Sequence, residues 1–181
     1  MITPAIRWQT WEGEGREHLA FAATADGFVA ESVILSDREA VFGAHYRVVL
    51  DEHWRVRRAE ITVVGGSRIV LTADGAGHWF DHDGTPLDAL DGAIDLDLSA
   101  SPFTNTLPIR RLGLPVGGSA EIVTAYVAFP ELAVSPDPQR YTRLSAARWR
   151  YESLDSDFIR EIDTDAEGFV TLYPGLFRRI A

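Results

Sequence analysis

Two carboxylates and two arginines lie close together near the middle of the sequence. Asp95 and Asp97 alternate with apolar residues in the segment 94–98, and the adjacent pair Arg110 and Arg111 follows in the next segment. Two carboxylates at this spacing can neutralise arginines, clamp a polar ligand together with them, or act as an acid–base pair. Because an unpaired buried charge is very costly, we favour a structural ion-pair network, in which Arg110 or Arg111 is partly buried and contacts Asp95 or Asp97. The ligand clamp and the catalytic pair stay open as alternatives.

Histidines and carboxylates gather a second time in the segment HWFDHDG, which covers residues 78–84. Imidazole and carboxylate groups are common metal ligands, so His78 and His82 with Asp81 and Asp83 are candidates for a metal site. The end of the segment, Asp83-Gly84, is more simply explained as a hairpin turn with His82 beside it. We therefore assign no metal site, and we expect no cofactor.

The residue types present exclude several kinds of chemistry. The chain of 181 residues has no cysteine, and all 17 of its basic residues are arginine. Thiolate nucleophiles, Schiff-base lysines and the lysine of a phosphate-binding P-loop are therefore excluded. No G-x-S-x-G elbow and no G-x-G-x-x-G dinucleotide fingerprint occurs. The 27 acidic residues give a net charge of −10, which argues against a nucleic-acid partner.

The length and the hydropathy pattern also bound the organisation of the protein. A chain of this size can bury one sizeable core, and no linker interrupts it, so we expect a single domain over residues 1–181. No apolar stretch is long enough to cross a membrane. The start, Met-Ile-Thr-Pro-Ala-Ile-Arg-Trp, lacks the pattern of a secretory signal, and we therefore expect a cytoplasmic protein.

The elements that must position these side chains are β-strands, because the dominant hydrophobic period is two. In the segment 54–64 the alternation changes phase, which predicts a β-bulge near Arg57 and Arg58. Turn dipeptides such as Asp26-Gly27, Asp74-Gly75 and Gly117-Gly118 separate the strands at short intervals, as expected for antiparallel hairpins. The predicted strands are 18–24, 27–35, 40–50, 54–64, 68–72, 77–82, 94–98, 120–129, 140–152, 157–163 and 169–173.

Two segments do not follow the strand pattern. Residues 101–114, SPFTNTLPIRRLGL, show no alternation, and a short helix there would place Leu107, Arg110, Arg111 and Leu114 at helical spacing. A lone short helix in a β-rich chain has to pack against the concave face of the sheet or fill the end of a barrel. The cluster of Pro130, Pro136 and Pro138 predicts one surface loop.

The segment around the predicted helix also carries a family resemblance. Residues 94–98, IDLDL, with residues 101–112, SPFTNTLPIRRL, resemble the signature of the bacterial putative glycolipid-binding family. The stretches RYTRL at 140–144 and GFV at 168–170, followed by YPGLF at 173–177, resemble the C-terminal half of that family. The resemblance extends over nearly the whole chain. It implies a spiral β-roll, in which a long antiparallel sheet wraps around a single helix, and it implies a homodimer and a likeness to carriers of bacterial lipoproteins.

Two functions remain open from the sequence. The first is a non-enzymatic binding protein, in which the sheet and the 101–114 helix enclose a cavity for a lipid or glycolipid. Its polar head would contact Asn105, Arg110 or Arg111, and the full candidate set is Thr104, Asn105, Arg110, Arg111, Asp95 and Asp97. The second is a small hydrolase or isomerase that uses Asp95, Asp97 or a histidine. We favour the binding protein and assign no catalytic residue.

Overall fold

The computed structural model describes residues 5–37 and 40–181. Strands and one α-helix make up almost all of its regular structure, with a single turn of 3₁₀-helix between β7 and β8. The elements are β1 (Ala5–Thr10), β2 (Gly15–Thr24), β3 (Gly27–Asp37), β4 (Val41–Asp51), β5 (Val56–Val63), β6 (Arg68–Ala73), β7 (Trp79–Phe80), η1 (Asp88–Leu90), β8 (Asp95–Leu98), α1 (Phe103–Leu112), β9 (Ser119–Ala128), β10 (Ala133–Arg143), β11 (Arg148–Ser153), β12 (Ile159–Thr164), β13 (Val170–Tyr173) and β14 (Phe177–Arg179).

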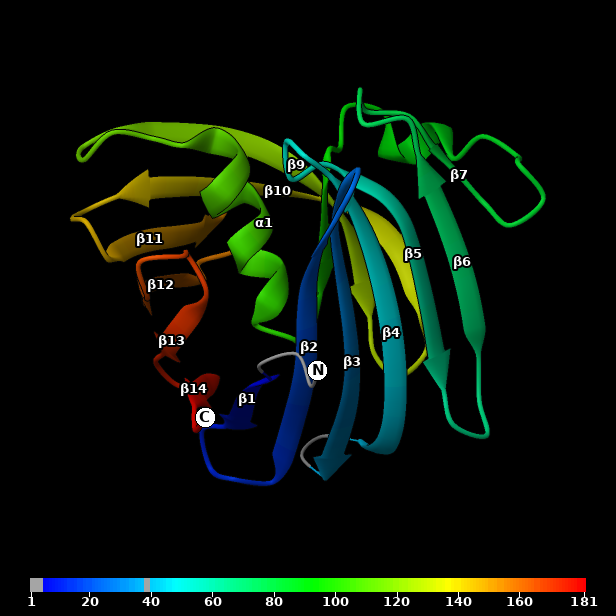
Figure 1. Ribbon diagram of the computed structural model, residues 1–181, viewed down its shortest axis with the longest axis horizontal. Coiled ribbons are helices and arrows are strands. Elements are labelled where there is room, and N and C mark those ends of the chain that lie inside the picture. Colours follow the sequence, from blue (N-terminus) through cyan, green and yellow to red (C-terminus); the bar gives the residue numbers. More distant parts are fainter. Residues whose placement is uncertain (1–4, 38–39) are drawn as a thin grey trace.

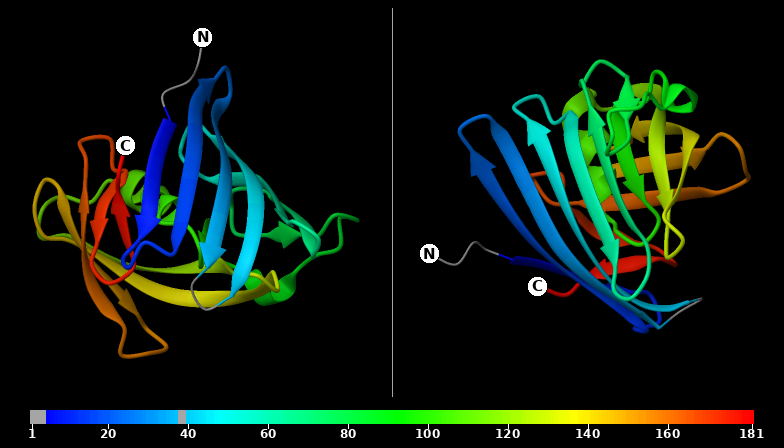
Figure 2. Two further views of the ribbon diagram at one scale, coloured as in Figure 1. Left: turned by 90° about the horizontal axis from the view of Figure 1, so that it is seen from below. Right: turned by 90° about the vertical axis from the view of Figure 1, so that its right-hand side faces the viewer.

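All the strands belong to one 14-stranded sheet. Its order runs from β7 back to β1, continues through the C-terminal strand β14, and ends at β8, so the first and last strands of the chain pair with each other. Figure 1 shows the long strands β2–β6 on one side, β11–β13 on the other, and α1 between them. Because β-strands twist, so long a sheet coils instead of lying flat. The two views in Figure 2 show this coiling around the helix. The expected all-β roll wrapped around one short helix is therefore confirmed.

One strand pair differs from all the others. β8 and β9 pair in parallel, with Asp95 opposite Thr124 and Leu98 opposite Val127. A parallel pair needs a crossover connection, because the chain must return to the same end of the sheet before the second strand begins. Helix α1 lies within that crossover. The parallel pairing therefore explains why an otherwise hairpin-connected chain contains a helix at this point.

Helix α1 is short and almost entirely enclosed. Every residue from Phe103 to Ile109 is buried, and Gly113 ends the helix with a left-handed conformation at φ 54°. Glycine adopts this conformation without a steric penalty. The predicted helix over 101–114 is confirmed, and its position inside the sheet explains why its sequence lacks a polar, solvent-facing stripe.

The buried side chains form two hydrophobic clusters. The larger cluster includes Trp8, Trp79 and Phe103 and fills the space between the strands β1–β9 and the start of α1. The smaller one includes Tyr141 and Trp149 and packs the end of α1 against β10–β13. The helix thus contributes to both clusters and links the two halves of the roll.

The predicted bulge is also present. In the pairing of β4 with β5, Val49 lies opposite Arg58 and the next residue, Leu50, lies opposite Val56. Arg57 is therefore the extra residue that changes the phase of the alternation. As a result, Val56 and Ala59 are both fully buried although they are three positions apart, a spacing that places residues of a regular strand on opposite faces.

One strand prediction is wrong, and two strands were not predicted. The segment 140–152, expected as one strand, contains parts of two: β10 ends at Arg143, the chain turns, and β11 begins at Arg148. The two halves of the predicted strand pair with each other, with Tyr141 opposite Tyr151. The turn between them contains serine and alanine and no glycine, which is why the pattern gave no signal. Strands β1 and β14 were not expected as strands at all.

The proline cluster is not one surface loop, in contrast to the prediction. Pro136 and Pro138 lie within β10 and pair with β9 opposite Ala125 and Val123. The carbonyl of Pro138 accepts a hydrogen bond from the N–H of Leu154 at 2.9 Å, on the β11 side of the strand. In a strand, the N–H and C=O groups of one residue point to the same side, so the missing N–H of these prolines lies on the side of β11. Because β11 has already ended there, the pairing of β10 with β9 loses no hydrogen-bond donor.

The two ends of the sheet are unlike each other. β7 has two residues and β8 has four, and α1 packs against β8. The homodimer that the family resemblance implies stays a prediction, for which these ends are the available sheet edges. Within residues 5–37 and 40–181, no helix combines the length and the apolar character needed to cross a membrane.

Candidate functional site

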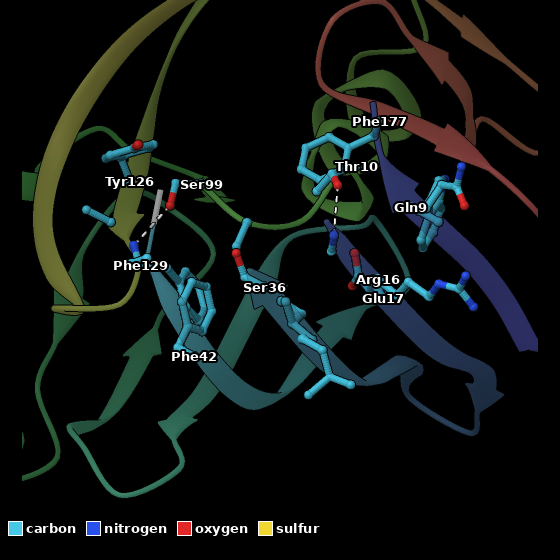
Figure 3. Close-up of a pocket in the computed structure, with 17 residues that line it drawn as sticks. Gln9, Thr10, Arg16, Glu17, Ser36, Phe42, Ser99, Tyr126, Phe129 and Phe177 are labelled. Carbon is cyan, nitrogen blue, oxygen red and sulfur yellow. Dashed lines mark hydrogen bonds between the residues drawn. The ribbon is translucent and has the colours of Figure 1, made fainter. Parts of the chain in front are cut away.

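A cavity of about 310 Å³, called the first cavity, lies on the concave side of the sheet near its N-terminal strands. It lies between the strands β1–β4 and the end of β9. Figure 3 shows Tyr126, Phe129 and Phe42 on one side of it and Gln9 and Phe177 on the other. Its lining combines apolar and hydroxyl-bearing side chains, and comprises Trp8, Gln9, Thr10, Gly15, Arg16, Glu17, Ile34, Leu35, Ser36, Ala40, Phe42, Ser99, Ala100, Tyr126, Ala128, Phe129 and Phe177.

A buried glutamate belongs to the wall of the first cavity. Glu17 is 4% exposed. Its Oε1 atom accepts hydrogen bonds from the hydroxyls of Tyr46 at 2.6 Å, Ser32 at 2.8 Å and Ser101 at 2.9 Å. Its Oε2 atom is buried and has no hydrogen-bond partner among the described residues. A buried polar atom without a partner is uncommon in folded proteins and calls for an explanation.

The environment of Glu17 favours the neutral carboxylic acid. Its neighbours on the adjacent strands are Trp8 on β1 and Ile34 on β3, both apolar and buried. Burial raises the pKa of Glu17 from 4.5 to about 7, although the hydrogen bonds from Tyr46, Ser32 and Ser101 lower it. Below neutral pH the group therefore carries a proton.

A second cavity adjoins the first. It has a volume of about 140 Å³, and it shares Ser99, Tyr126 and Phe177 with the first cavity. Ser101 lines the second cavity and donates a hydrogen bond to Glu17 in the wall of the first, so this contact spans the boundary between them. The complete lining comprises Asp97, Leu98, Ser99, Ser101, Asn105, Tyr126, Tyr151, Phe158, Tyr173, Leu176 and Phe177.

Asp97 is the carboxylate of the second cavity. Its Oδ1 atom accepts a hydrogen bond from Thr104 at 3.0 Å, and its Oδ2 atom accepts one from the amide of Gln139 at 2.7 Å. Burial raises the pKa of Asp97 to about 6 against the lowering effect of these two bonds. Asn105 also lines this cavity and donates to the hydroxyl of Tyr141 at 2.9 Å. Of the candidate binding residues, Asp97 and Asn105 therefore line this cavity, and Thr104 contacts Asp97 from outside the lining.

The expected ion pair forms between Asp95 and Arg111. The Nε atom of Arg111 lies 3.0 Å from Oδ1, and its Nη2 atom lies 2.6 Å from Oδ2, a two-pronged arrangement. Asp95 is fully buried, and the side chain of Arg111 is 16% exposed. Neither residue lines the first or the second cavity. This pair therefore connects β8 to α1 in the interior of the roll.

The adjacent arginine lies in a different environment. The guanidinium of Arg110 is 4.8 Å from the ring centre of Trp54, which places a cation over an aromatic face. Arg110 also lines a third cavity of about 170 Å³ together with Arg143 and Asp165. The structure thus separates Arg110 and Arg111, and only Arg111 contacts one of the two predicted aspartates.

The histidine cluster divides into two exposed pairs. His78 contacts Asp74, with Nδ1 and Oδ2 2.6 Å apart, and Asp74 also accepts backbone bonds that close its turn. His82 contacts the neighbouring Asp83 at 3.1 Å, and both side chains are exposed. Across the part of the chain that the structure describes, no group of three or more His, Cys, Asp or Glu side chains has an arrangement that could hold a metal ion.

Sequence reasoning missed Glu17 and its three hydroxyl partners. The signal was present, because Glu17 alternates with Leu19 and Phe21 on the face of β2 that carries the core residues. The predicted strand began at residue 18, one position too late to place a carboxylate on that apolar face. The partners come from β3, β4 and the loop before α1, and no local pattern connects these segments.

Comparisons with known proteins agree with this architecture. A family model described as putative glycolipid-binding matches residues 5–179. The crystal structure of a DUF1089 family protein from Pseudomonas aeruginosa is similar, with 41% sequence identity, a TM-score of 0.84 and coverage of 92% of each chain. No curated protein matches the sequence. Since the family model spans nearly the whole chain, this protein belongs to the putative glycolipid-binding family.

Proposed function

We propose that this protein is a non-enzymatic binding protein for a glycolipid or a similar amphiphile, held in the first and second cavities. The observation that carries the proposal is that the two cavities adjoin and differ in chemistry. Trp8, Ile34 and Phe129 give the first cavity an apolar wall on which an acyl chain can lie. The second cavity offers aromatic rings beside a carboxylate and an amide.

That second set of side chains suits a sugar. The rings of Tyr151, Phe158 and Tyr173 present flat apolar faces, against which the C–H surface of a sugar ring can pack. Asp97 and Asn105 offer acceptor and donor groups for sugar hydroxyls. The polar head of the ligand would therefore lie over Asp97 and Asn105. The arginines that the sequence also suggested are engaged elsewhere, in the ion pair and over an aromatic ring.

An acid–base enzyme is the second candidate. The favouring observation is the pKa of Asp97, about 6, because a catalytic acid or base works best with a pKa near the operating pH. Both oxygens of Asp97 already accept hydrogen bonds from the protein, however, and Asp95 is held by Arg111. Release of a chromophore from a nitrophenyl glucoside or a nitrophenyl octanoate, lost in Asp97→Asn, would support the enzyme over the binding protein.

The binding function is tested with a simple amphiphile and a cavity-filling variant. We expect titration calorimetry to detect octyl β-glucoside below its micelle concentration. Ala128→Phe places a large side chain in the first cavity and is expected to weaken this binding at least tenfold. Ala22→Phe is the matched control, because Ala22 alternates with the core-facing Phe21 and so lies on the other face of β2. Absence of binding, or equal binding by both variants, would contradict the proposal.

The natural ligand requires a separate experiment. Native mass spectrometry of the protein purified from its own host is expected to show a bound mass that organic extraction removes. Fragmentation of that mass should give both an acyl and a sugar component. A ligand without any apolar chain would contradict the assignment of the first cavity.

A further inference from the structure

We propose that Glu17 recognises a carbonyl group at the junction between the apolar chain and the sugar of the ligand, with its Oε2–H group as the hydrogen-bond donor. The inference rests on the proposed function and deepens it, because it names the linkage that the site selects: an uncharged acyl ester or acyl amide. Three observations support it, namely the position of Glu17, the bonding of its two oxygens and the charges around it.

Glu17 lies where such a junction must lie. It belongs to the wall of the first cavity, and its hydrogen-bond partner Ser101, 2.9 Å away, belongs to the wall of the second. An amphiphile with its chain in one cavity and its sugar in the other therefore passes this contact. In acylated sugars the atoms at that point are those of the ester or amide linkage.

The bonding of the two carboxyl oxygens determines which one carries the proton. Oε1 accepts from the hydroxyls of Tyr46, Ser32 and Ser101, and an oxygen with that many donors around it acts as the carbonyl oxygen of the acid. The proton then belongs to Oε2, the atom without a partner in the described part of the chain. A protonated Oε2 is a donor that needs an acceptor. Because this atom is itself buried, we expect the carboxyl group to turn toward the cavity when a carbonyl oxygen there supplies one.

The surroundings of Glu17 keep it neutral. Trp8 on β1 and Ile34 on β3 face it from the two neighbouring strands, and Tyr46 on β4 is the titratable group in contact with it. Arg16 precedes Glu17 on β2, is exposed, and also contributes to the lining of the first cavity. The raised pKa of Glu17, about 7, agrees with this arrangement. Within the residues that the structure describes, the groups bonded to Glu17 are all neutral hydroxyls, with no cation among them, which favours an uncharged group at this contact.

The experiment compares two ligands that differ at the linkage. N-octanoyl-β-glucosylamine has a carbonyl between its chain and its sugar, and octyl β-glucoside has an ether oxygen there. At pH 6 we expect the carbonyl ligand to bind about tenfold more tightly. Between pH 6 and pH 8 its affinity should fall about tenfold, because the protonated fraction of a group with a pKa near 7 falls by that factor. The affinity of octyl β-glucoside should change little.

Two variants assign the effect to Glu17. Glu17→Gln keeps an oxygen for the three hydroxyls and an N–H donor at the position of Oε2, so it should bind the carbonyl ligand with equal affinity at pH 6 and pH 8. Asp97 also titrates in this range, since its pKa is about 6. Asp97→Asn is therefore the control, and it should retain the pH dependence.

The outcomes separate this inference from the function on which it rests. If both ligands bind with the same affinity and the same pH profile, the role of Glu17 is overturned while amphiphile binding stands. If neither ligand binds, both proposals are overturned. Should Glu17→Gln fail to fold, the comparison of the two ligands on the wild-type protein still decides, because only the carbonyl ligand is expected to respond to pH.

Discussion

Two buried carboxyl groups in this protein have opposite surroundings. Asp95 on β8 is fully buried, and Arg111 binds both of its oxygens. Glu17 on β2 is also buried, but its partners are three neutral hydroxyls on one oxygen, and the other oxygen has no partner among the described residues. Both oxygens of Asp95 have hydrogen-bond partners within the protein. In the described part of the chain, Glu17 has a partner on only one oxygen, and it borders a cavity.

The difference teaches how a structural carboxyl is distinguished from a functional one. Burial raises the pKa of both groups, so the direction of the shift alone does not separate them. Two other properties distinguish the groups: the number of carboxyl oxygens that have a hydrogen-bond partner, and whether the group borders a cavity. A carboxylate with a charged partner on both oxygens stabilises the fold, while one with a vacant bonding position beside a cavity can bind a ligand.

The largest expected effect is the loss of the ion pair. Arg111→Ala leaves Asp95 buried without a cation, which should lower the free energy of unfolding by about 3–5 kcal/mol at pH 7. Chemical denaturation measures this change. The double variant Asp95→Leu/Arg111→Met should recover most of the loss, because it removes both charges. A loss below about 0.5 kcal/mol for Arg111→Ala would show that the pair is not structural.

Loss of the proton from Glu17 as the pH rises should have the next largest effect on the free energy of unfolding. The folded pKa, about 7, lies above the unfolded value of 4.5, so the native state binds the extra proton. Glu17 therefore makes its full contribution to the free energy of unfolding below pH 4.5, and this contribution is lost as the pH rises to 7. The difference corresponds to about 3 kcal/mol.

Glu17→Gln abolishes that pH dependence. Relative to wild type, we expect the variant to gain about 3 kcal/mol between pH 4.5 and pH 8, measured by denaturation at both pH values. Asp95→Asn should instead be less stable than wild type at both pH values, since it leaves Arg111 without a charged partner. If the free energy of unfolding changes with pH in the same way for wild type and Glu17→Gln, the prediction that Glu17 carries this pH dependence is wrong.

A smaller change sharpens the description of the hydroxyl cluster. Tyr46→Phe removes one of the three donors to Oε1 of Glu17. We expect a loss of about 1 kcal/mol at pH 5, where the acid is neutral, and about 2 kcal/mol at pH 8, where the lost bond is to a charged group. The pKa of Glu17 should rise further, because the bond from Tyr46 lowers it. Carbon NMR of the labelled carboxyl group measures that pKa directly, and a fall would contradict the prediction.

The smallest expected effect concerns the neighbouring arginine. Arg110→Ala removes the cation over the ring of Trp54 and should lower stability by about 0.5–1 kcal/mol, far less than Arg111→Ala. Thermal unfolding of the two variants side by side measures the difference. Equal losses would mean that the two arginines share one role, which the ion-pair geometry contradicts.

Much of the fold followed from local patterns. The period-two alternation predicted most strands, and the change of phase after Val56 predicted the bulge at Arg57. The helix was recognisable because its segment lacked any alternation. Arg111 and Asp95 were among the four residues expected to form an ion pair, because the cost of an unpaired buried charge depends only on residue type and burial.

Other features depend on contacts that sequence does not encode locally. The pairing of β1 with β14 joins the two ends of the chain, and the site for Glu17 combines β2, β3, β4 and the loop before α1. The prolines of β10 are tolerated only because β11 ends where their missing N–H groups point. Each of these depends on which distant segment lies alongside.

The sequence by itself therefore determined the β-rich class, the glycine-containing turns, the bulge and the helix, since periodicity and turn chemistry act over a few residues. The tertiary structure alone decided which arginine meets which aspartate, and it alone placed a carboxyl with one open bonding position beside a cavity. The physical reason is that burial and hydrogen-bond satisfaction are properties of an assembled environment. Glu17 has the same residue type as any exposed glutamate, and only the apolar strands around it raise its pKa and hold its proton.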